Sequence, residues 1–195
     1  MNILCILSLM VGWLLGTPSL AQATSGLIMP ALWVMAFAAG AVMGAEGALQ
    51  VAFSRMGLRI LLLPAMIAVG SVLAGGTMGM ILGIEPGASL AASAGFGWYS
   101  ISAVIVGQIG STEHAMLCFI VNLVREVAAL VIIPVLAERV GAFEAIAPAG
   151  ATAMDTALPI LTRSAGSVAA VAAVITGFVL SVSVPVLVGF FYTLF

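Results

Sequence analysis

The stretch HAMLCFIVNLVREVAALVIIPVL, residues 114–136, decides the fold class of this chain. It is long enough to cross a bilayer, because a membrane helix needs about 20 mostly apolar residues. Its apolar residues follow one another instead of alternating with polar ones, so it does not have the pattern of a strand in a membrane β-barrel. Since unpaired backbone groups are too costly in hydrocarbon, the stretch predicts a transmembrane α-helix.

The composition extends this prediction to the whole chain. Of its 195 residues, 64% are hydrophobic and only 6% are charged, with no lysine, whereas a soluble domain carries about 25% charged residues. The net charge of −2 excludes nucleic-acid binding, which needs a basic face. Cys5 and Cys118 are interpreted as small hydrophobic residues, and no His/Cys cluster indicates a metal or another cofactor.

Charged residues and Gly/Pro clusters divide the chain into apolar segments. We predict an all-α, polytopic membrane helix bundle that forms a single transporter domain over residues 1–195. The segments have the approximate bounds 3–20, 31–47, 60–84, 88–108, 114–136, 146–161 and 167–194. The segments 88–108 and 146–161 are interrupted, so they are expected to be discontinuous helices, either broken or re-entrant. Residues 1–23 end in Ala-Gln-Ala, which leaves a retained helix and a cleaved signal peptide as alternatives.

Two weaker patterns concern orientation and packing. Arg55 and Arg59 form the only positive cluster and favour a cytoplasmic loop after the second segment. Gly75, Gly79 and Gly83 recur at four-residue spacing, which places them on one helical stripe. This stripe predicts close helix packing within one protomer, with an oligomer interface as the alternative.

Residues 122–126, Asn-Leu-Val-Arg-Glu, place charge in the middle of the fifth segment. A charged side chain at the bilayer centre costs roughly 2.5–3.5 kcal/mol. Asn122 and Glu126 share a helix face, whereas Arg125 points about 100° away from Glu126. We therefore expect each charged residue to meet a partner on another helix. The cluster is interpreted as an ion or substrate site, with a structural ion pair as the alternative.

Asp155 lies in the interrupted segment 146–161, close to Thr152 and Thr156. Pro159 has no N–H group, so the Asp155 carbonyl loses its helical hydrogen-bond partner. This pattern predicts a short or broken helix that offers a carboxylate, hydroxyl groups and a free carbonyl to a cation. The alternative is a proline-kinked helix with a packed aspartate.

The other interrupted segment contains Ser93–Ser102, SAGFGWYSIS. Gly95 and Gly97 permit unwound backbone, which at membrane depth survives only when protein or a water-filled cavity surrounds it. Trp98 and Tyr99 add large faces with polar tips, which suit a cavity wall or, alternatively, an interfacial aromatic belt. Two interrupted segments on either side of a charged helix indicate a secondary transporter with a site near the membrane midplane.

Four motifs carry a family resemblance. They are GFGWYS (95–100), NLVRE (122–126), GATAMDTALP (150–159) and GFVLSVSVPVL (177–187). In this order they resemble the bacterial lysine-exporter family LysO, most clearly from about Gly87 to the C-terminus and more faintly back to about Ala31. The resemblance implies L-lysine export through the bacterial inner membrane. It also implies that the family's intramembrane acids correspond to Glu126 and Asp155.

The chain departs from the family pattern in two places. Comparable proteins have about 300 residues, and about a hundred of them precede the part that this chain resembles. Some relatives look split, which implies a small membrane partner that supplies the missing N-terminal helices, or pairing of the chain with itself. The serine that usually precedes the Met–Asp pair is Ala153 here, so a hydroxyl group near the site is lost.

We therefore predict an exporter of a small cationic amino acid, most simply lysine, driven by protons through alternating access. Glu126 and Asp155 are predicted to exchange a proton for the substrate ammonium, with Arg125 keeping Glu126 poised or taking the substrate carboxylate. A non-transport membrane subunit is the alternative. An enzyme is not expected, because His114 has no evident catalytic partner and is interpreted as interfacial. An aspartic dyad of the two acids is the remaining enzymatic alternative.

Overall fold

The computed structural model describes residues 57–195, together with Val34 and Phe37, which are helical. The chain divides into two compact units, Met1–Val42 and Met43–Phe195. The predicted segments 3–20 and 31–47, the signal-peptide question and Arg55 lie outside the described residues. The second unit contains η1 (Gly57–Leu61), α4 (Leu62–Leu82), α5 (Pro86–Ser93), α6 (Tyr99–Ile109), α7 (Thr112–Arg139), η2 (Glu144–Ile146), η3 (Gly150–Met154) and α8 (Leu158–Leu194).

The turn between α4 and α5 follows from two residues. Gly83 ends α4 in the left-handed conformation, with φ of 69°, and its N–H donates to the carbonyls of Gly79 and Met80. Pro86 begins α5, where its fixed φ suits the first helical turn and its missing N–H costs nothing. The chain therefore reverses sharply and lays α5 against α4.

Capping and charged residues mark both ends of the helix α7. The Ser111 hydroxyl caps its N-terminus by accepting a hydrogen bond from the His114 N–H. Glu113 lies in the first turn and Arg139 in the last, which complements the helix dipole. One stripe of the helix is buried and consists of Cys118, Asn122, Glu126, Ala129 and Ile133. The polar motif therefore faces the protein interior.

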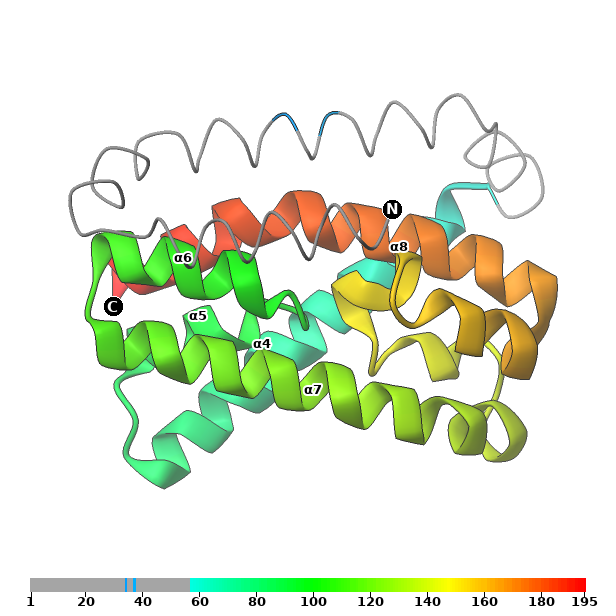
Figure 1. Cartoon of the computed structure of the whole chain (residues 1–195), viewed down its shortest axis with the longest axis horizontal. Coiled ribbons are helices and arrows are strands. Elements are labelled where there is room, and N and C mark those ends of the chain that lie inside the picture. Colours follow the sequence, from blue (N-terminus) through cyan, green and yellow to red (C-terminus); the bar gives the residue numbers. More distant parts are fainter. Residues whose placement is uncertain (1–33, 35–36, 38–56) are drawn as a thin grey trace, which may run out of the picture. The chain divides into compact units, whose positions relative to one another are not determined.

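The chain between α7 and α8 is built of short 3-10 turns, η2 and η3. The last helix, α8, is divided at Gly166, whose φ of 85° and ψ of 174° are not helical. In Figure 1, α7 and α8 extend along the same direction, with α4 behind them and η2 and η3 beside α8. The short elements α5, α6, η2 and η3 pack against these long helices.

Close packing of α4 on α5 depends on two glycines. A Cβ atom on Gly75 would lie 1.6 Å from the Ser93 Oγ, and one on Gly79 would lie 2.3 Å from the Ser89 Cβ. The prediction of packing within the protomer is thus confirmed for these two residues. It is wrong for Gly83, which has open space around its Cβ position and acts as a helix cap.

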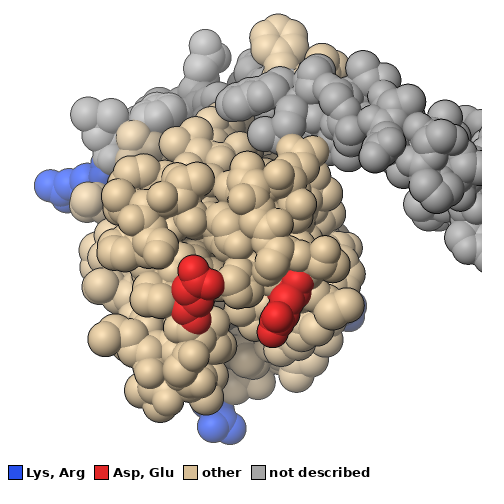
Figure 2. Space-filling model, turned by 90° about the vertical axis from the view of Figure 1, so that its left-hand side faces the viewer, with Lys and Arg blue, Asp and Glu red and all other residues tan. Residues whose placement is uncertain are grey.

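Large apolar side chains remain exposed on the outside of the bundle. On α4 they include Val69, Leu73, Met80, Ile81 and Leu82. Such a surface suits lipid, because a soluble protein rarely exposes a large contiguous apolar patch. Figure 2 shows one face, on which uncharged residues cover most of the described surface and acidic side chains stand apart. The predicted fold class, an all-α membrane helix bundle, is confirmed.

Three helices of the described chain are long and apolar enough to cross a membrane: Arg59–Leu82, Thr112–Arg139 and Leu158–Leu194. The bounds of α4, of α7 and of α8 after Gly166 lie within three residues of the predicted segments 60–84, 114–136 and 167–194. The segment 88–108 contains two short helices, and 146–161 contains 3-10 turns and the start of α8. Their interpretation as discontinuous membrane helices stays a prediction.

Candidate functional site

Asn122 joins the middle of α7 to the chain around the end of α5. Its side chain is only 1% exposed. The Oδ1 atom accepts a hydrogen bond from the Gly97 N–H at 2.7 Å, and Nδ2 donates to the Ala92 carbonyl at 2.8 Å and to the Cys118 carbonyl at 2.9 Å. Both ends of the amide are therefore occupied by backbone groups, which fixes the chain between α5 and α6 on α7.

The sequence Gly-Phe-Gly, residues 95–97, lets the chain between α5 and α6 approach Asn122 closely. A Cβ atom on Gly95 would lie 2.4 Å from the Asn122 Nδ2, so no side chain fits there. Phe96 and Gly97 have positive φ, 48° and 93° respectively, and Phe96 is fully buried. A positive φ in a buried aromatic residue is unusual and marks a conformation that the surrounding structure imposes.

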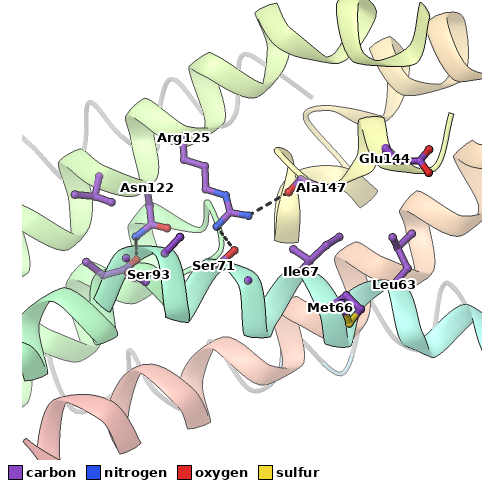
Figure 3. Close-up of a pocket in the computed structure, with 14 residues that line it drawn as sticks. Leu63, Met66, Ile67, Ser71, Ser93, Asn122, Arg125, Glu144 and Ala147 are labelled. Carbon is purple, nitrogen blue, oxygen red and sulfur yellow. Dashed lines mark hydrogen bonds between the residues drawn. The ribbon is translucent and has the colours of Figure 1, made fainter. Parts of the chain in front are cut away.

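Arg125 joins α7 to the other interrupted segment and to α4. Its Nε donates to the Pro148 carbonyl at 3.0 Å, and Nη2 donates to the Ala147 carbonyl at 3.2 Å. Nη1 donates to the Ser71 hydroxyl at 2.9 Å. Figure 3 shows the guanidinium between Ser71 on α4 and Ala147. The expectation that Arg125 meets partners on other elements is confirmed by these contacts.

The two interrupted segments contact each other directly. The Ala151 N–H donates to the Phe96 carbonyl at 2.9 Å. Gly150 has a φ of 61°, and a Cβ atom on it would lie 2.4 Å from that same carbonyl oxygen. A Cβ atom on Gly97 would lie 3.2 Å from the Ala149 carbonyl oxygen. We call this contact of residues 95–97 and 147–151, with Asn122 and Arg125 holding its two sides, the junction.

The helix α8 supports the junction from another side. A Cβ atom on Gly177 would lie 2.6 Å from the Met154 nitrogen and 2.9 Å from the Ala151 carbonyl oxygen. The glycine therefore lets the backbone of η3 approach α8 closely. Thr152 is buried within η3, and its hydroxyl donates to the Ala149 carbonyl at 2.9 Å.

Glu126 lies on the buried stripe of α7, one turn after Asn122. Its side chain is 9% exposed, and no hydrogen bond or ion pair of its carboxylate occurs among the described residues. The expectation that Glu126 meets a partner on another helix is therefore not met among the described residues. Its role in holding a proton or a cation stays a prediction.

Asp155 has a different environment from Glu126. It is exposed at the end of η3, and one carboxylate oxygen accepts a hydrogen bond from the Thr156 N–H. The prediction of a free Asp155 carbonyl is wrong, because this oxygen accepts the Leu158 N–H at 3.2 Å. A turn closes there before Pro159 is reached. Within residues 57–195, no hydrogen bond or ion pair joins the carboxylates of Asp155 and Glu126.

The predicted site residues fall into two groups. Gly95, Gly97, Asn122, Arg125 and Thr152 meet at the junction. Trp98 and Tyr99 are half-buried at the start of α6, where the Tyr99 ring packs edge-on against Phe119 with centroids 5.2 Å apart. Thr156 and Pro159 are exposed beside Asp155. Their roles in binding stay predictions.

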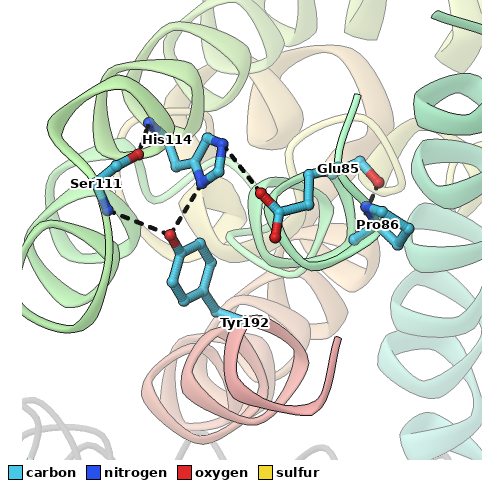
Figure 4. A network of polar contacts seen from close by, with 6 residues as sticks. Glu85, Pro86, Ser111, His114 and Tyr192 are labelled. Atoms are coloured by element: carbon cyan, nitrogen blue, oxygen red, sulfur yellow. Dashed lines mark hydrogen bonds and ion pairs between the residues drawn. The ribbon is translucent and has the colours of Figure 1, made fainter. Parts of the chain in front are cut away.

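A second polar cluster lies where three helix ends meet, and we call it the end cluster. The Tyr192 hydroxyl accepts the Ser111 N–H at 3.2 Å and lies 2.9 Å from the His114 Nδ1. The His114 Nε2 lies 3.5 Å from a Glu85 carboxylate oxygen. Figure 4 shows His114 between Glu85 and Tyr192. Sequence reasoning did not identify these two partners of His114, and its interpretation as interfacial stays a prediction.

Sequence reasoning also missed Ser71. It is one of few hydroxyl residues in an apolar helix, and that was the only signal available. Among the described residues, no group of three His, Cys, Asp or Glu side chains is placed to hold a metal ion. The polar atoms at the junction are mainly backbone carbonyls, amides and one guanidinium, which suit a small polar molecule better than a transition metal.

Comparison with known proteins assigns a family to this fold. Residues 5–192 match the family model described as lysine exporter LysO. A stretch of 142 residues is 34% identical to lysine exporter LysO of Escherichia coli K12, covering 73% of this chain and 46% of that protein. A stretch of 131 residues is 32% identical to a Haemophilus influenzae protein named "Putative lysine exporter", covering 67% of each chain. No solved structure matches.

This chain belongs to the LysO family. The resemblance inferred from the four motifs is thereby confirmed. The chain spans about half the length of the Escherichia coli relative. The match to the LysO family model includes α4 to α8 and therefore the whole junction. The junction, Glu126 and Asp155 consequently lie within the residues that match the family.

Proposed function

We propose that this chain exports lysine across the bacterial inner membrane, as part of a proton-coupled carrier. Membership of an exporter family and a helix bundle with an apolar exterior support a transport role. The observation that carries the proposal is Glu126, a buried carboxylate with no partner among the described residues. Intramembrane acids of this kind usually face an ion or substrate pathway.

In this mechanism Glu126 and Asp155 alternately hold a proton and the substrate ammonium. Either carboxyl group can hold a proton or an ammonium group, because it accepts hydrogen bonds when ionised and carries a donor when protonated. The exposed position of Asp155 suits the stage at which substrate enters or leaves. Movement of the bundle between two open states completes the cycle of alternating access.

A second part of the proposal concerns the assembly of the carrier. We propose that the working carrier contains a second copy of this chain or a small membrane partner. Co-expression with a tagged second copy, followed by purification, distinguishes self-association from the need for another protein.

Charge removal at the two acids tests the transport proposal. Cells that express Glu126→Gln or Asp155→Asn are fed a lysine-containing dipeptide, and lysine efflux is measured. We expect each variant to reduce efflux at least about tenfold, because an amide cannot exchange a proton and a loss of about 1.4 kcal/mol suffices for this factor. Glu138→Gln is the matched control, because Glu138 is an exposed acid near the end of the same helix. Normal efflux in both variants, at wild-type protein levels, contradicts the assignment of these acids.

A non-transport membrane subunit is the second candidate, and the contacts of Arg125 favour it. Its hydrogen bonds to Ser71, Ala147 and Pro148 hold elements together, as expected of polar residues that stabilise a membrane bundle. This candidate predicts that charge-neutral variants of the two acids lower only the amount of folded protein. It also predicts that charge-conserving variants restore that amount, and that lysine efflux is absent throughout.

A further inference from the structure

A groove of about 620 Å³ lies between α4 and α7, on the side of the junction that Arg125 faces. Its walls are mainly apolar and include Leu63, Met66 and Ile67 from α4, as Figure 3 shows. Ser71, Ser93, Asn122 and Arg125 contribute its polar positions, and Glu144 lies at the end near Leu63. Glu126 does not line this groove, so the groove is separate from the acid of the proposed transport mechanism.

Arg125 is the cation of this groove, and its charge is not balanced by an acid nearby. No carboxylate of the described chain lies within ion-pair distance of its guanidinium. A guanidinium has five N–H donors, and the hydrogen bonds to Pro148, Ser71 and Ala147 use three of them. One N–H on each terminal nitrogen therefore remains for a ligand. Because the other three donors are fixed by protein, the guanidinium is held in place before a ligand arrives.

The shape and chemistry of the groove suit an amino acid. Small-molecule sites are typically apolar concavities of about 300–1,000 Å³ with a few polar groups that fix orientation, and this groove has that form. A carboxylate matches the donor geometry of arginine better than a single-point anion does. The apolar wall formed by Leu63, Met66 and Ile67 suits an aliphatic chain extending from that carboxylate.

We infer that the groove binds the transported amino acid, with its α-carboxylate on Arg125 and its aliphatic side chain along α4. This inference rests on the proposed function for the identity of the ligand as lysine. It assigns Ser71 and the α4 wall to substrate recognition and gives Arg125 two tasks: it holds residues 147–148 and receives the substrate. The exchange of proton and ammonium at Glu126 remains a separate step.

The test compares ligands with and without a carboxylate on the purified full chain in lipid nanodiscs. Binding of L-lysine and of cadaverine, which is lysine without its carboxylate, is measured by equilibrium dialysis. We expect cadaverine to bind at least tenfold more weakly than lysine. Equal binding of the two compounds overturns the inference. Displacement of bound lysine by phosphatidylglycerol in the nanodisc also overturns it, because a lipid phosphate then occupies Arg125.

Groove-filling variants give the second arm of the test. Gly70 lines the groove and has no atom within 4 Å of its Cβ position, so Gly70→Leu places a side chain there without disturbing the Arg125 hydrogen bonds. Ala74→Leu fills the groove one turn further along α4. Gly189→Leu is the matched control, because Gly189 has equally open space but lies on α8, away from the groove.

We expect Gly70→Leu and Ala74→Leu to weaken lysine binding at least tenfold and Gly189→Leu to leave it unchanged. Lysine binding equal to the control in both filled variants overturns the inference. Lysine efflux is measured in parallel from cells that express the wild-type chain, so that any partner of the carrier is present. If the wild-type chain exports lysine while Gly70→Leu and Ala74→Leu bind lysine normally, the groove is not the substrate site, but the proposed transport function still stands. Carboxylate-dependent binding without any efflux supports the groove and refutes the proposed transport function.

Discussion

The junction and the end cluster use polar side chains in opposite ways. At the junction, Asn122 and Arg125 bond mainly to backbone groups, and Asn122 is fully enclosed. At the end cluster, His114 and Tyr192 bond to each other, and Glu85 is 56% exposed on its side chain. The junction fixes segments that lie outside the α-helices, whereas the end cluster connects the ends of helices that are already formed.

This difference has an energetic consequence. A buried backbone group that loses its partner costs about 1–3 kcal/mol, whereas an exposed ion pair contributes about 0–1 kcal/mol. Disturbing the junction is therefore expected to unfold or rearrange the bundle near Glu126. Disturbing the end cluster is expected to loosen helix ends and leave the junction intact. The following predictions test this difference, beginning with the largest effect.

Gly150→Ala is expected to be the most damaging single change. Gly150 has a φ of 61°, and an added Cβ atom meets the Phe96 carbonyl oxygen, which is backbone and cannot turn away. The left-handed conformation alone costs about 1–2 kcal/mol for an alanine. With the clash included, we expect the free energy of unfolding to fall by at least about 3 kcal/mol. Unfolding in an SDS titration, followed by tryptophan fluorescence, measures this.

Gly189→Ala is the control for Gly150→Ala. Its Cβ position is open and its backbone is helical, so the substitution is expected to be neutral or to stabilise by up to about 1 kcal/mol. A similar loss of stability in both variants is inconsistent with a special role for the junction. It indicates instead that the bundle does not tolerate added volume at any glycine.

Asn122→Ala is expected to have the next largest effect. It leaves the buried Gly97 N–H without a partner and removes one of two donors to the Ala92 carbonyl, which still accepts the Gly95 N–H. We expect a loss of about 2 kcal/mol, toward the middle of the range for unsatisfied buried groups. Asn122→Asp keeps the oxygen that accepts the Gly97 N–H but removes the N–H that donates to the Ala92 carbonyl. Comparing its loss of stability with that of Asn122→Ala distinguishes the contributions of the two hydrogen bonds. SDS unfolding again provides the measurement.

Ser183→Ala controls for loss of a polar side chain in the bundle. The Ser183 hydroxyl bonds only to the Val179 carbonyl of its own helix, which has its own backbone partner. We expect its removal to change stability by less than about 0.5 kcal/mol. If Asn122→Ala is no more damaging than this control, Asn122 does not hold the chain between α5 and α6, and the contrast with the end cluster fails.

Much of this architecture was predictable because it depends on local sequence. Apolar length predicted α4, α7 and the last part of α8, since a spanning helix is limited by the bilayer. The position of Arg125 in an apolar helix predicted that it meets other elements, since an unpaired polar group there is costly. The same expectation is not met for Glu126, which has no partner among the described residues. The glycines at 95 and 97 marked the interruption because they permit backbone conformations that other residues avoid.

The pairing of distant segments was not predictable in the same way. Nothing local indicates that the Phe96 carbonyl receives the Ala151 N–H, or that Ser71 faces Arg125. The free carbonyl expected at Asp155 was wrong because a tighter turn supplied the Leu158 N–H in place of residue 159. The partners of His114 were missed because Glu85 and Tyr192 come from loops and helix ends far away in sequence. Tertiary contacts decide all of these cases.

Tyr192→Phe tests the end cluster at its centre. The substitution removes the hydroxyl that meets the Ser111 N–H and the His114 Nδ1 and keeps the ring. We expect a loss of about 1 kcal/mol, as for one partly exposed hydrogen-bonded group. Hydrogen exchange is expected to increase at the start of α7 and to stay unchanged at residues 95–97. Faster exchange at the junction contradicts the separation of the two regions.

Tyr99→Phe is the matched control for Tyr192→Phe. The Tyr99 ring packs against Phe119, and no hydrogen bond of its hydroxyl occurs in the part of the chain that the structure describes. Removal of this hydroxyl is expected to change stability by less than about 0.5 kcal/mol. If the two substitutions lower stability equally, the loss comes from removing a tyrosine hydroxyl in general and not from the hydrogen bonds of Tyr192.

Glu85→Gln is expected to have the smallest effect. The pair with His114 spans 3.5 Å, and the Glu85 side chain is 56% exposed, so its contribution is about 0.5 kcal/mol or less. The charged part of this contribution exists only while the imidazole is protonated. The stability difference between wild type and variant in SDS unfolding is therefore expected to be small and to depend on salt.

Salt and a distant acid provide the controls for this last prediction. Because the pair is exposed, about 1 M NaCl is expected to remove most of the difference, since the Debye length then falls to about 3 Å. Glu138→Gln, at an exposed acid in the last turns of α7, is expected to show no such salt dependence. A difference that is large and insensitive to salt means that Glu85 acts as a buried partner would. The end cluster then resembles the junction, and the two regions no longer differ in how they use charge.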